Sequence, residues 1–240
     1  MKKRNFVLRG FNAFTLAEVL ITLVIIGVIA TLTVPSLIQR TNNQEYVSGL
    51  KKAYSVLSQA LQQIIADEGA PESSEDAWNA PNNITNTFKK HLNVVKECSN
   101  DCMKQRYKSL YGTAYGSSNW SISIDYQAGS GKLVLSDGMQ IALGGSVNCT
   151  ASTHFNNGAG KICGRINVDV NGEKGPNKLG RDLFWFSITE DGRIFPCCSN
   201  ETLQDTYMCG DTNKYQPSDG DWTAGWGCAR RVLTEDAMNY

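Results

Sequence analysis

The first forty residues contain a long apolar run that follows a short basic stretch. Between Glu18 and Arg40 lie 21 residues with no Asp, Glu, Lys or Arg. About 20 apolar residues are enough for a helix to cross the hydrocarbon core of a bilayer. Residues 1–13 hold four bases and no acid, a bias that favours a cytoplasmic N-terminus and export of the rest. The pattern therefore predicts a single membrane-spanning helix.

Beyond Pro35 the apolar run gives way to an amphipathic stripe. Apolar residues recur every three to four positions over residues 46–65, with polar residues between them. That spacing predicts a helix with one buried face, and Gly69 with Pro71 supplies its end. We therefore expect one helix over residues 14–66, bent at Pro35 and roughly 80 Å long. A coiled coil is the alternative, disfavoured by the short length and by Ser and Gly within the stripe.

Two hairpins are predicted in the second half of the chain. Apolar and polar residues alternate around Asp137-Gly138 and around Asp191-Gly192. An Asp-Gly pair between alternating segments is the strongest short-range hairpin signal. Further alternating segments run over residues 122–126 and 162–170. Together these patterns predict an antiparallel sheet.

The segment between the helix and the strands is less regular. Residues 70–119 are mixed, with one short amphipathic piece around residues 88–95. A long helix followed by an antiparallel sheet predicts an α+β head, without an internal linker that would divide it. Four regions are expected: a cleaved basic leader at 1–13, a membrane or filament-core helix at 14–39, its amphipathic continuation at 40–69 and the head at 70–240.

Composition and charge narrow the function classes. The chain has 240 residues, of which 41% are hydrophobic and 19% charged, as expected of a folded protein. Beyond residue 13 it carries 19 bases and 23 acids, a balance that disfavours a basic nucleic-acid-binding surface. Its two histidines, His91 and His154, are far apart with no nucleophile signature beside them. We therefore expect neither a His-based metal site nor enzymatic activity.

Eight cysteines indicate an oxidising, extracytoplasmic location for the head. All lie after residue 97 and their number is even, a usage typical of disulfides. Zinc is the alternative, but no second pair or histidine follows Cys98 and Cys102 at a finger-like distance. Eight cysteines allow 105 pairings, of which Cys98–Cys102 and Cys149–Cys163 are expected because they close short loops. The remaining disulfide candidates are Cys197, Cys198, Cys209 and Cys228.

Several kinds of segment share a long N-terminal apolar run. A secretory signal requires small residues in an A-x-A arrangement after the run, and residues 29–35 lack that arrangement. A plain uncleaved anchor fits the length but does not explain Glu18, because ionisable groups within a span are rare and usually functional. The residues around Glu18 indicate a third kind of segment.

The segment Ala13-Phe14-Thr15-Leu16-Ala17-Glu18-Val19-Leu20 resembles the class III signal of type IV pilins and type II secretion pseudopilins. In that family a prepilin peptidase cuts before an aromatic residue, usually Phe, and N-methylates the new terminus. The fifth mature residue is Glu, and a proline lies further along the helix. A cut between Ala13 and Phe14 makes Glu18 the fifth mature residue and Pro35 the twenty-second. The register, the apolar run, the Glu and the Pro all agree with the family.

One position departs from the family pattern. The family normally has Gly before the cut, where this chain has Ala13. The nearby Gly10-Phe11 pair would offer Gly-Phe, but a cut there would make Glu18 the eighth mature residue. We therefore expect processing between Ala13 and Phe14, with N-methylation of Phe14.

The resemblance also implies a fold, a location and partners. The expected fold is pilin-like, a long N-terminal helix packed on an antiparallel sheet. The expected location is the inner membrane, single-pass with a cytoplasmic N-terminus, and then an extracytoplasmic filament. The implied partners are other pilin or pseudopilin subunits, the prepilin peptidase, the inner-membrane assembly machinery and membrane lipid.

The segment from Asp169 to Asp182 is rich in oxygen ligands and glycine. It begins like a calcium loop, with Asp169 and Asn171, but Lys174 and Gly180 stand where that loop needs Gly and Glu. A turn-rich connection between two strands is the favoured interpretation. Because some pseudopilins bind calcium in their heads, Asp169, Asn171 and Asp182 are kept as calcium candidates, and no other cofactor is expected.

The expected function is structural. The chain is expected to be a subunit of a type II secretion pseudopilus or a type IV pilus that assembles through its N-terminal helix. One alternative is a DNA-uptake pilin or adhesin whose head binds a ligand, and another is a plain membrane-anchored extracytoplasmic binding protein. Glu18 is the expected assembly residue, because a new amine at Phe14 would offset the roughly 2–3 kcal/mol cost of its carboxylate in lipid. That amine could belong to the same helix or to a neighbouring subunit, and the resemblance to pilins favours the neighbouring subunit.

Overall fold

The computed structural model describes most of the chain and divides it into two compact units. The units are Met1–Asn42 and Asn43–Tyr240, and each is described by itself. Ala13, Phe14, His154, Cys198 and the alternating segment at 122–126 lie outside the described residues. The structure describes residues 15–71, 81–98, 102–103, 107–110, 131–150, 160–197, 209 and 224–240.

Helix α1 extends over Leu16–Glu68 and contains Pro35, which confirms the predicted helix to within two residues at each end. Gly69 ends it, as predicted. The φ of Gly69 is +92°, a left-handed conformation that glycine adopts without strain, and its N–H donates to the carbonyl of Ile65 at 3.0 Å. The bend at Pro35 stays a prediction.

The apolar run of α1 lies in the first unit with its side chains exposed. Its large hydrophobic residues, from Leu16 to Ile38, are all at least 44% exposed. By length and composition, α1 is the one helix in the described part of the chain that could cross a membrane. The coarse expectation of a long apolar N-terminal helix therefore agrees with the structure.

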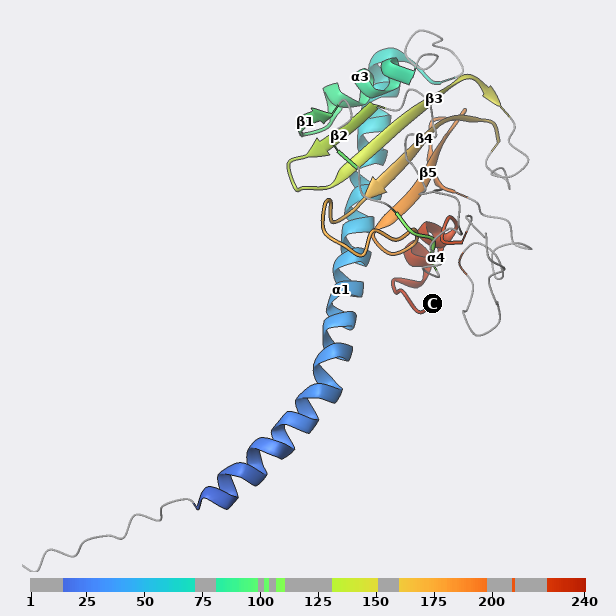
Figure 1. The fold of residues 1–240 in the computed structure, drawn as a ribbon. Helices are drawn as coiled ribbons and strands as arrows, with labels where there is room; N and C mark the ends of the chain where they lie inside the picture. Colours follow the sequence, from blue (N-terminus) through green and yellow to red (C-terminus); the bar gives the residue numbers. More distant parts are fainter. Residues whose placement is uncertain are drawn as a thin grey trace, which may run out of the picture. The chain divides into compact units, whose positions relative to one another are not determined.

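The second unit contains a six-stranded antiparallel sheet in the order β1-β2-β3-β4-β5-β6 (Figure 1). Neighbours in the sheet are therefore neighbours along the chain, as in a meander. Both predicted Asp-Gly hairpins are confirmed, with Gly138 at φ +89° and Gly192 at φ +73° in their turns. The strands are β1 (Val94–Cys98), β2 (Gly131–Leu135), β3 (Gln140–Thr150), β4 (Ile162–Asp169), β5 (Leu183–Thr189) and β6 (Ile194–Pro196).

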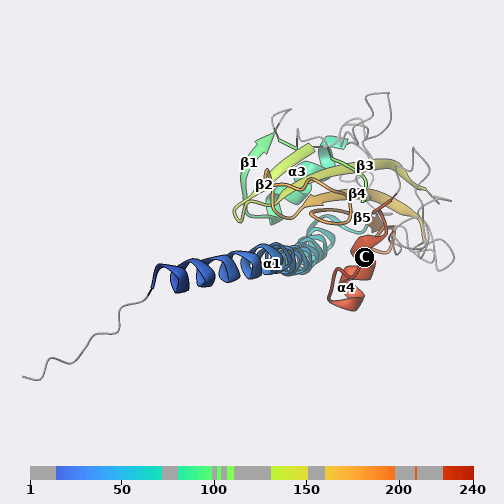
Figure 2. The same cartoon turned by 60° about the horizontal axis from the view of Figure 1, so that its bottom comes forward.

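The main core lies between the second half of α1 and one face of this sheet (Figures 1 and 2). Inward residues of the strands, such as Ile166 and Phe186, join α1 and α3 (Pro81–His91) in one buried cluster. The rings of Tyr54 and Phe186 stack with centroids 5.9 Å apart. The amphipathic stripe thus packs on the chain's own sheet and is buried at Tyr46, Val47, Leu50, Ala53, Leu57, Ala60, Leu61 and Ile64.

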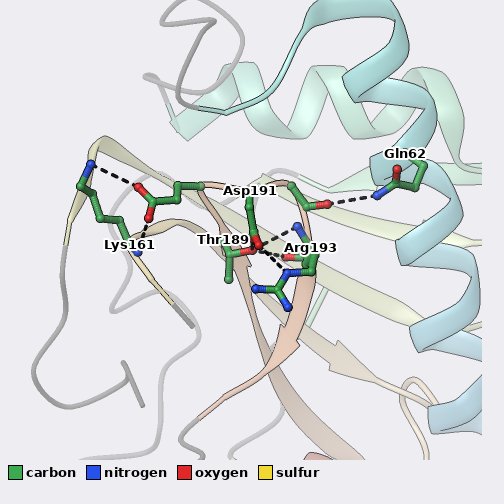
Figure 3. A network of polar contacts seen from close by, with 7 residues as sticks. Gln62, Lys161, Thr189, Asp191 and Arg193 are labelled. Atoms are coloured by element: carbon green, nitrogen blue, oxygen red, sulfur yellow. Dashed lines mark hydrogen bonds and ion pairs between the residues drawn. The ribbon is translucent and has the colours of Figure 1, made fainter. Parts of the chain in front are cut away.

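The β5–β6 turn, beside the last strand of the sheet, contacts α1 (Figure 3). The Gln62 side-chain amide of α1 donates to the carbonyl of Gly192 at 3.1 Å. Within the turn, Asp191 accepts hydrogen bonds from the Thr189 hydroxyl and from Arg193. A Cβ at Gly192 would come within 2.2 Å of the Ile65 side chain. The left-handed conformation favours glycine at this position, and a larger residue would also displace the end of the Ile65 side chain.

Two elements differ from the sequence-based expectation. The amphipathic piece around residues 88–95 is not one element, because it comprises the end of α3 and the start of β1. The short helix α4 (Cys228–Glu235) was not predicted. Its buried residues are Cys228, Ala229 and Val232, and two of these are too small to give a hydrophobic period.

The described cysteines form disulfides rather than a zinc site. The bonds Cys98–Cys102 and Cys149–Cys163 confirm the two expected pairs. A third bond joins Cys209 to Cys228 at the start of α4, and Cys197 is also disulfide-bonded. The sheet face opposite α1 is covered by a second cluster that includes Cys98, Cys102, Tyr107, Leu179 and Trp226.

Candidate functional sites

Glu18 lies in the first turn of α1 and forms a capping box with Thr15. The Thr15 backbone N–H and hydroxyl both donate to Glu18 Oε2 at 2.8 Å, and the Glu18 N–H donates to Thr15 Oγ1 at 3.2 Å. These reciprocal bonds satisfy backbone donors that a helix start leaves unpaired. Glu18 therefore has a local structural role that the sequence analysis did not identify, although Thr-x-x-Glu is a known sequence signal for it.

The capping box leaves part of the Glu18 carboxylate open. Both of its side-chain bonds from Thr15 go to Oε2, and none of the described residues donates to Oε1. A carboxylate has acceptor capacity on both oxygens. An additional donor, such as an amine, can therefore bind Glu18 without displacing Thr15.

The hydroxyl groups of the apolar run are satisfied within the helix. The hydroxyls of Thr22, Thr31, Thr33 and Ser36 each donate to a backbone carbonyl three or four residues earlier, at 2.9 Å. Such internal satisfaction is what a helix needs in lipid or in a dry interface, where water cannot supply the missing partners. Glu18 is the one side chain of the run with an ionisable group.

The second candidate site is the β4–β5 loop, residues 170–182, with Asp169 and Asp182 at its two ends. Both carboxylates are fully buried. The Tyr107 hydroxyl donates to Asp169 Oδ2 at 2.6 Å and the Asn171 N–H to Asp169 Oδ1 at 3.2 Å. The N–H groups of Asn177 and Lys178 donate to the two oxygens of Asp182, both at 2.7 Å.

Burial dominates the electrostatics of the loop. It raises the pKa of Asp169 to about 7, against the opposing effect of the Tyr107 hydrogen bond, and nearby Asp182 raises it further. Burial also raises the pKa of Asp182, although hydrogen bonds from Lys178 and Asn177 favour its ionised form. The Tyr107 hydroxyl has its pKa raised by burial and by the Asp169 charge, so it remains a donor.

The calcium candidates Asp169, Asn171 and Asp182 stay a prediction. All four carboxylate oxygens of Asp169 and Asp182 already accept a hydrogen bond from an N–H or O–H donor. Two buried amide oxygens, of Asn171 and Asn177, lack a hydrogen-bond partner, but two amides are too few ligands for this ion. In the described part of the chain, no group of three or more His, Cys, Asp or Glu could hold a metal. The described hydrogen bonds of the two carboxylates hold the ends of the loop.

Sequence reasoning missed the contacts that hold this loop to the rest of the second unit. The Tyr46 hydroxyl of α1 donates to the carbonyl of Gly175 at 3.3 Å. The Tyr240 hydroxyl donates to the carbonyl of Gly180 at 2.5 Å, and Arg181 donates to the backbone oxygen of Tyr240 at 2.6 Å. No local pattern identifies these partners, because they lie between 59 and 129 positions apart along the chain.

The remaining candidates have ordinary surroundings. His91 is mostly buried, and its Nε2 lies 3.6 Å from a carboxylate oxygen of Asp67. Trp226 is buried in the second cluster, with its ring 4.5 Å from that of Trp185. Neither residue faces a nucleophile among the described contacts.

Comparison with known proteins gives no relative. No family model, no curated protein and no solved structure matches this chain.

Proposed function

We propose that this chain is a pilin-like structural subunit that is processed between Ala13 and Phe14 and assembles through α1 into a membrane-anchored extracytoplasmic filament. A type II secretion pseudopilus and a type IV pilus are the two machines that fit. The subunit performs no catalysis. Its head would be presented along or at the end of the filament.

One observation carries the proposal. A single helix, α1, has an apolar half whose large side chains are all at least 44% exposed and which contains one carboxylate, followed by a half whose stripe is buried in the head. The exposed half needs a non-aqueous partner, since its large apolar side chains are not buried among the described residues. Lipid satisfies that need before assembly, and the same helices of neighbouring subunits would satisfy it in a filament.

The open Oε1 of Glu18 supports a defined role in assembly. Processing would create a positive α-amine at Phe14, and in a staggered bundle the amine of one subunit can reach Glu18 of the next. The capping box holds the carboxylate at the helix start, so the acceptor is positioned before its partner arrives. The ion pair would set the axial register, while the apolar side chains supply packing.

Processing tests the proposal directly. The full chain is produced in membranes with an active prepilin peptidase, and the extracted protein is analysed by intact mass and N-terminal sequencing. We expect a chain that begins at Phe14 with a methylated amine. Ala13→Gly should be cut at least as fast, because it restores the residue usual in the family.

Gly10→Ala is the matched control, since it alters the other Gly-Phe junction and should leave the cut unchanged. A membrane-bound chain that retains Met1–Ala13 while the peptidase processes another substrate in the same cells would contradict the proposal. It would favour a plain membrane-anchored binding protein instead.

A further inference from the structure

Some basic side chains on the surface of the second unit form ion pairs with carboxylates and others do not. Away from the β4–β5 loop, most described lysines and arginines have a carboxylate within 4 Å, for example Lys51 with Asp236 and Lys52 with Asp137 at 2.8 Å. Around the loop, Lys108, Lys174 and Lys178 form no ion pair with any described residue. Further paired bases are Lys89, Lys90, Lys161, Arg193 and Arg231.

Backbone pairing brings two of these unpaired bases together. Lys108 and Lys178 are partners in a parallel bridge. The Lys108 N–H donates to the Asn177 carbonyl and the Leu179 N–H to the Lys108 carbonyl, both at 2.9 Å. Like charges placed opposite each other in this way are unfavourable. A counter-ion outside the chain would relieve the repulsion.

Arg181 lies on the same loop. Its guanidinium donates to the backbone oxygen of Tyr240, the last residue of the sequence, and to Asn43 Oδ1. We define Lys108, Lys174 and Lys178 as the basic face. The exposed carboxylates on the adjoining segments are Glu45 and Glu173, and Asp169 and Asp182 are turned inward and buried.

The basic face lies beside the first residues of the second unit. Arg181 contacts Asn43, and Gly175, next to Lys174, contacts Tyr46. Asn43 follows the end of the apolar run at Arg40 by three residues, which span at most about 11 Å even when fully extended. Headgroups add roughly 5–7 Å outside each face of the hydrocarbon core, and charges interact over about 8 Å at physiological salt. Chain length alone therefore keeps Asn43, and with it the contacting Arg181, within reach of the headgroups.

We propose that the basic face binds the anionic phospholipid headgroups of the membrane that the apolar run crosses. This inference rests on the membrane span of the proposed function. Headgroup phosphates would neutralise the adjacent Lys108 and Lys178, and the head would rest on the bilayer before assembly. Leaving the membrane for a filament would then require breaking these contacts, so the lipid charge would affect extraction.

Lysine reactivity tests the inference on the full chain. The protein is placed in nanodiscs of phosphatidylcholine alone or with one quarter phosphatidylglycerol, and acylation rates are measured by mass spectrometry. We expect Lys108 and Lys178 to react about fivefold more slowly in the anionic discs, the factor that a typical lysine–headgroup attraction gives. High salt should remove the difference. Lys96, on the edge strand β1, should react equally in both lipids.

A double variant distinguishes lipid binding by the basic face from a general effect of lipid charge on lysine acylation. Lys108→Gln with Lys178→Gln should abolish the slower acylation of Lys174 in anionic discs, whereas the matched Lys96→Gln should preserve it. Equal rates in both lipids, in a chain that resists alkaline carbonate extraction, would overturn this inference and leave the proposed function intact. A chain that carbonate extracts would overturn the membrane span and this inference together.

Discussion

Asp169 illustrates how a single buried acid sets the response of the head to pH. Its carboxyl has a pKa raised to about 7 by burial, whereas the unfolded chain would titrate near 4. Between these values the folded state retains a proton that the unfolded state has released. The free energy of unfolding should therefore fall as the pH rises from about 4 to about 7, by at most about 1.4 kcal/mol per pH unit.

Asp169→Asn should reduce this dependence. The amide keeps the shape of the carboxyl, its oxygen can still accept from the Asn171 N–H, and the Tyr107 oxygen can accept from its NH2. The measurement is denaturant unfolding of the full chain in detergent at several pH values between 4.5 and 7.5, with EDTA present. Glu173→Gln, an exposed acid on the same loop, should keep the wild-type slope. An unchanged slope in Asp169→Asn would contradict this assignment.

Asp182, whose pKa burial also raises, contributes to the slope in the same direction as Asp169, whereas two other carboxyls act outside that pH window. The Lys161 N–H lowers the pKa of Glu190, and the Thr189 hydroxyl lowers that of Asp191. A group with a lowered folded pKa contributes stability that is lost only as the pH falls through that value. Glu190 and Asp191 should therefore weaken the fold below about pH 4 and leave the Asp169 slope measurable above it.

At the scale of elements, the second half of α1 is the main support of the sheet. Leu61 is fully buried in the cluster that joins α1 to the strands. Leu61→Ala should lower the free energy of unfolding by about 2–5 kcal/mol, through lost burial and the cavity that remains. Gln59, on the exposed side of the same helix, bonds only Ser55 among the described residues. Gln59→Ala should change stability by less than about 0.5 kcal/mol in the same denaturation experiment, and equal losses would contradict the packing.

How well each element could be predicted from sequence depends on where its determinants lie. The α1 stripe and the two Asp-Gly hairpins are encoded within 20 residues each, so their patterns predicted them correctly. Strand β1 (Val94–Cys98) is an edge strand with three exposed central residues, so it has no alternating pattern to detect. Helix α4 is positioned by the Cys209–Cys228 disulfide and by burial of small residues, which a hydrophobic period does not report.

The candidate sites also could be predicted only where their determinants lie close together in sequence. Glu18 was identified from its register in a local motif, and its capping partner Thr15 lies three positions away. The contacts of Asp169 and Asp182 were not predictable, because Tyr107 is 62 positions from Asp169 and no period links them. The short Cys98–Cys102 and Cys149–Cys163 loops were predicted correctly, since both partners are near in sequence.

At the scale of the whole molecule, the proposed function assigns different roles to the two units. The exposed apolar run would hold the chain in lipid and then in the filament core, and the disulfide-bonded head would carry the outer surface. Glu18 is the one ionisable group of the run, and it would lie in lipid before assembly and in the filament core afterwards. Its capping role and its charge can be separated, because glutamine at the same position of a capping box also reaches back to the N-cap N–H.

Co-assembly of Glu18 variants therefore tests the central claim most directly. Processed Glu18→Gln and Glu18→Ala are expressed with wild-type subunits and the assembly machinery, and their share in sheared, cross-linked filaments is measured. Both variants should insert in the membrane and be cleaved, because removing a charge makes the span more apolar. Glu45→Ala, which removes an exposed acid from the head part of the same helix, should assemble normally. We predict that both Glu18 variants are excluded from filaments; their normal incorporation would contradict the account and leave the apolar run as a plain membrane anchor.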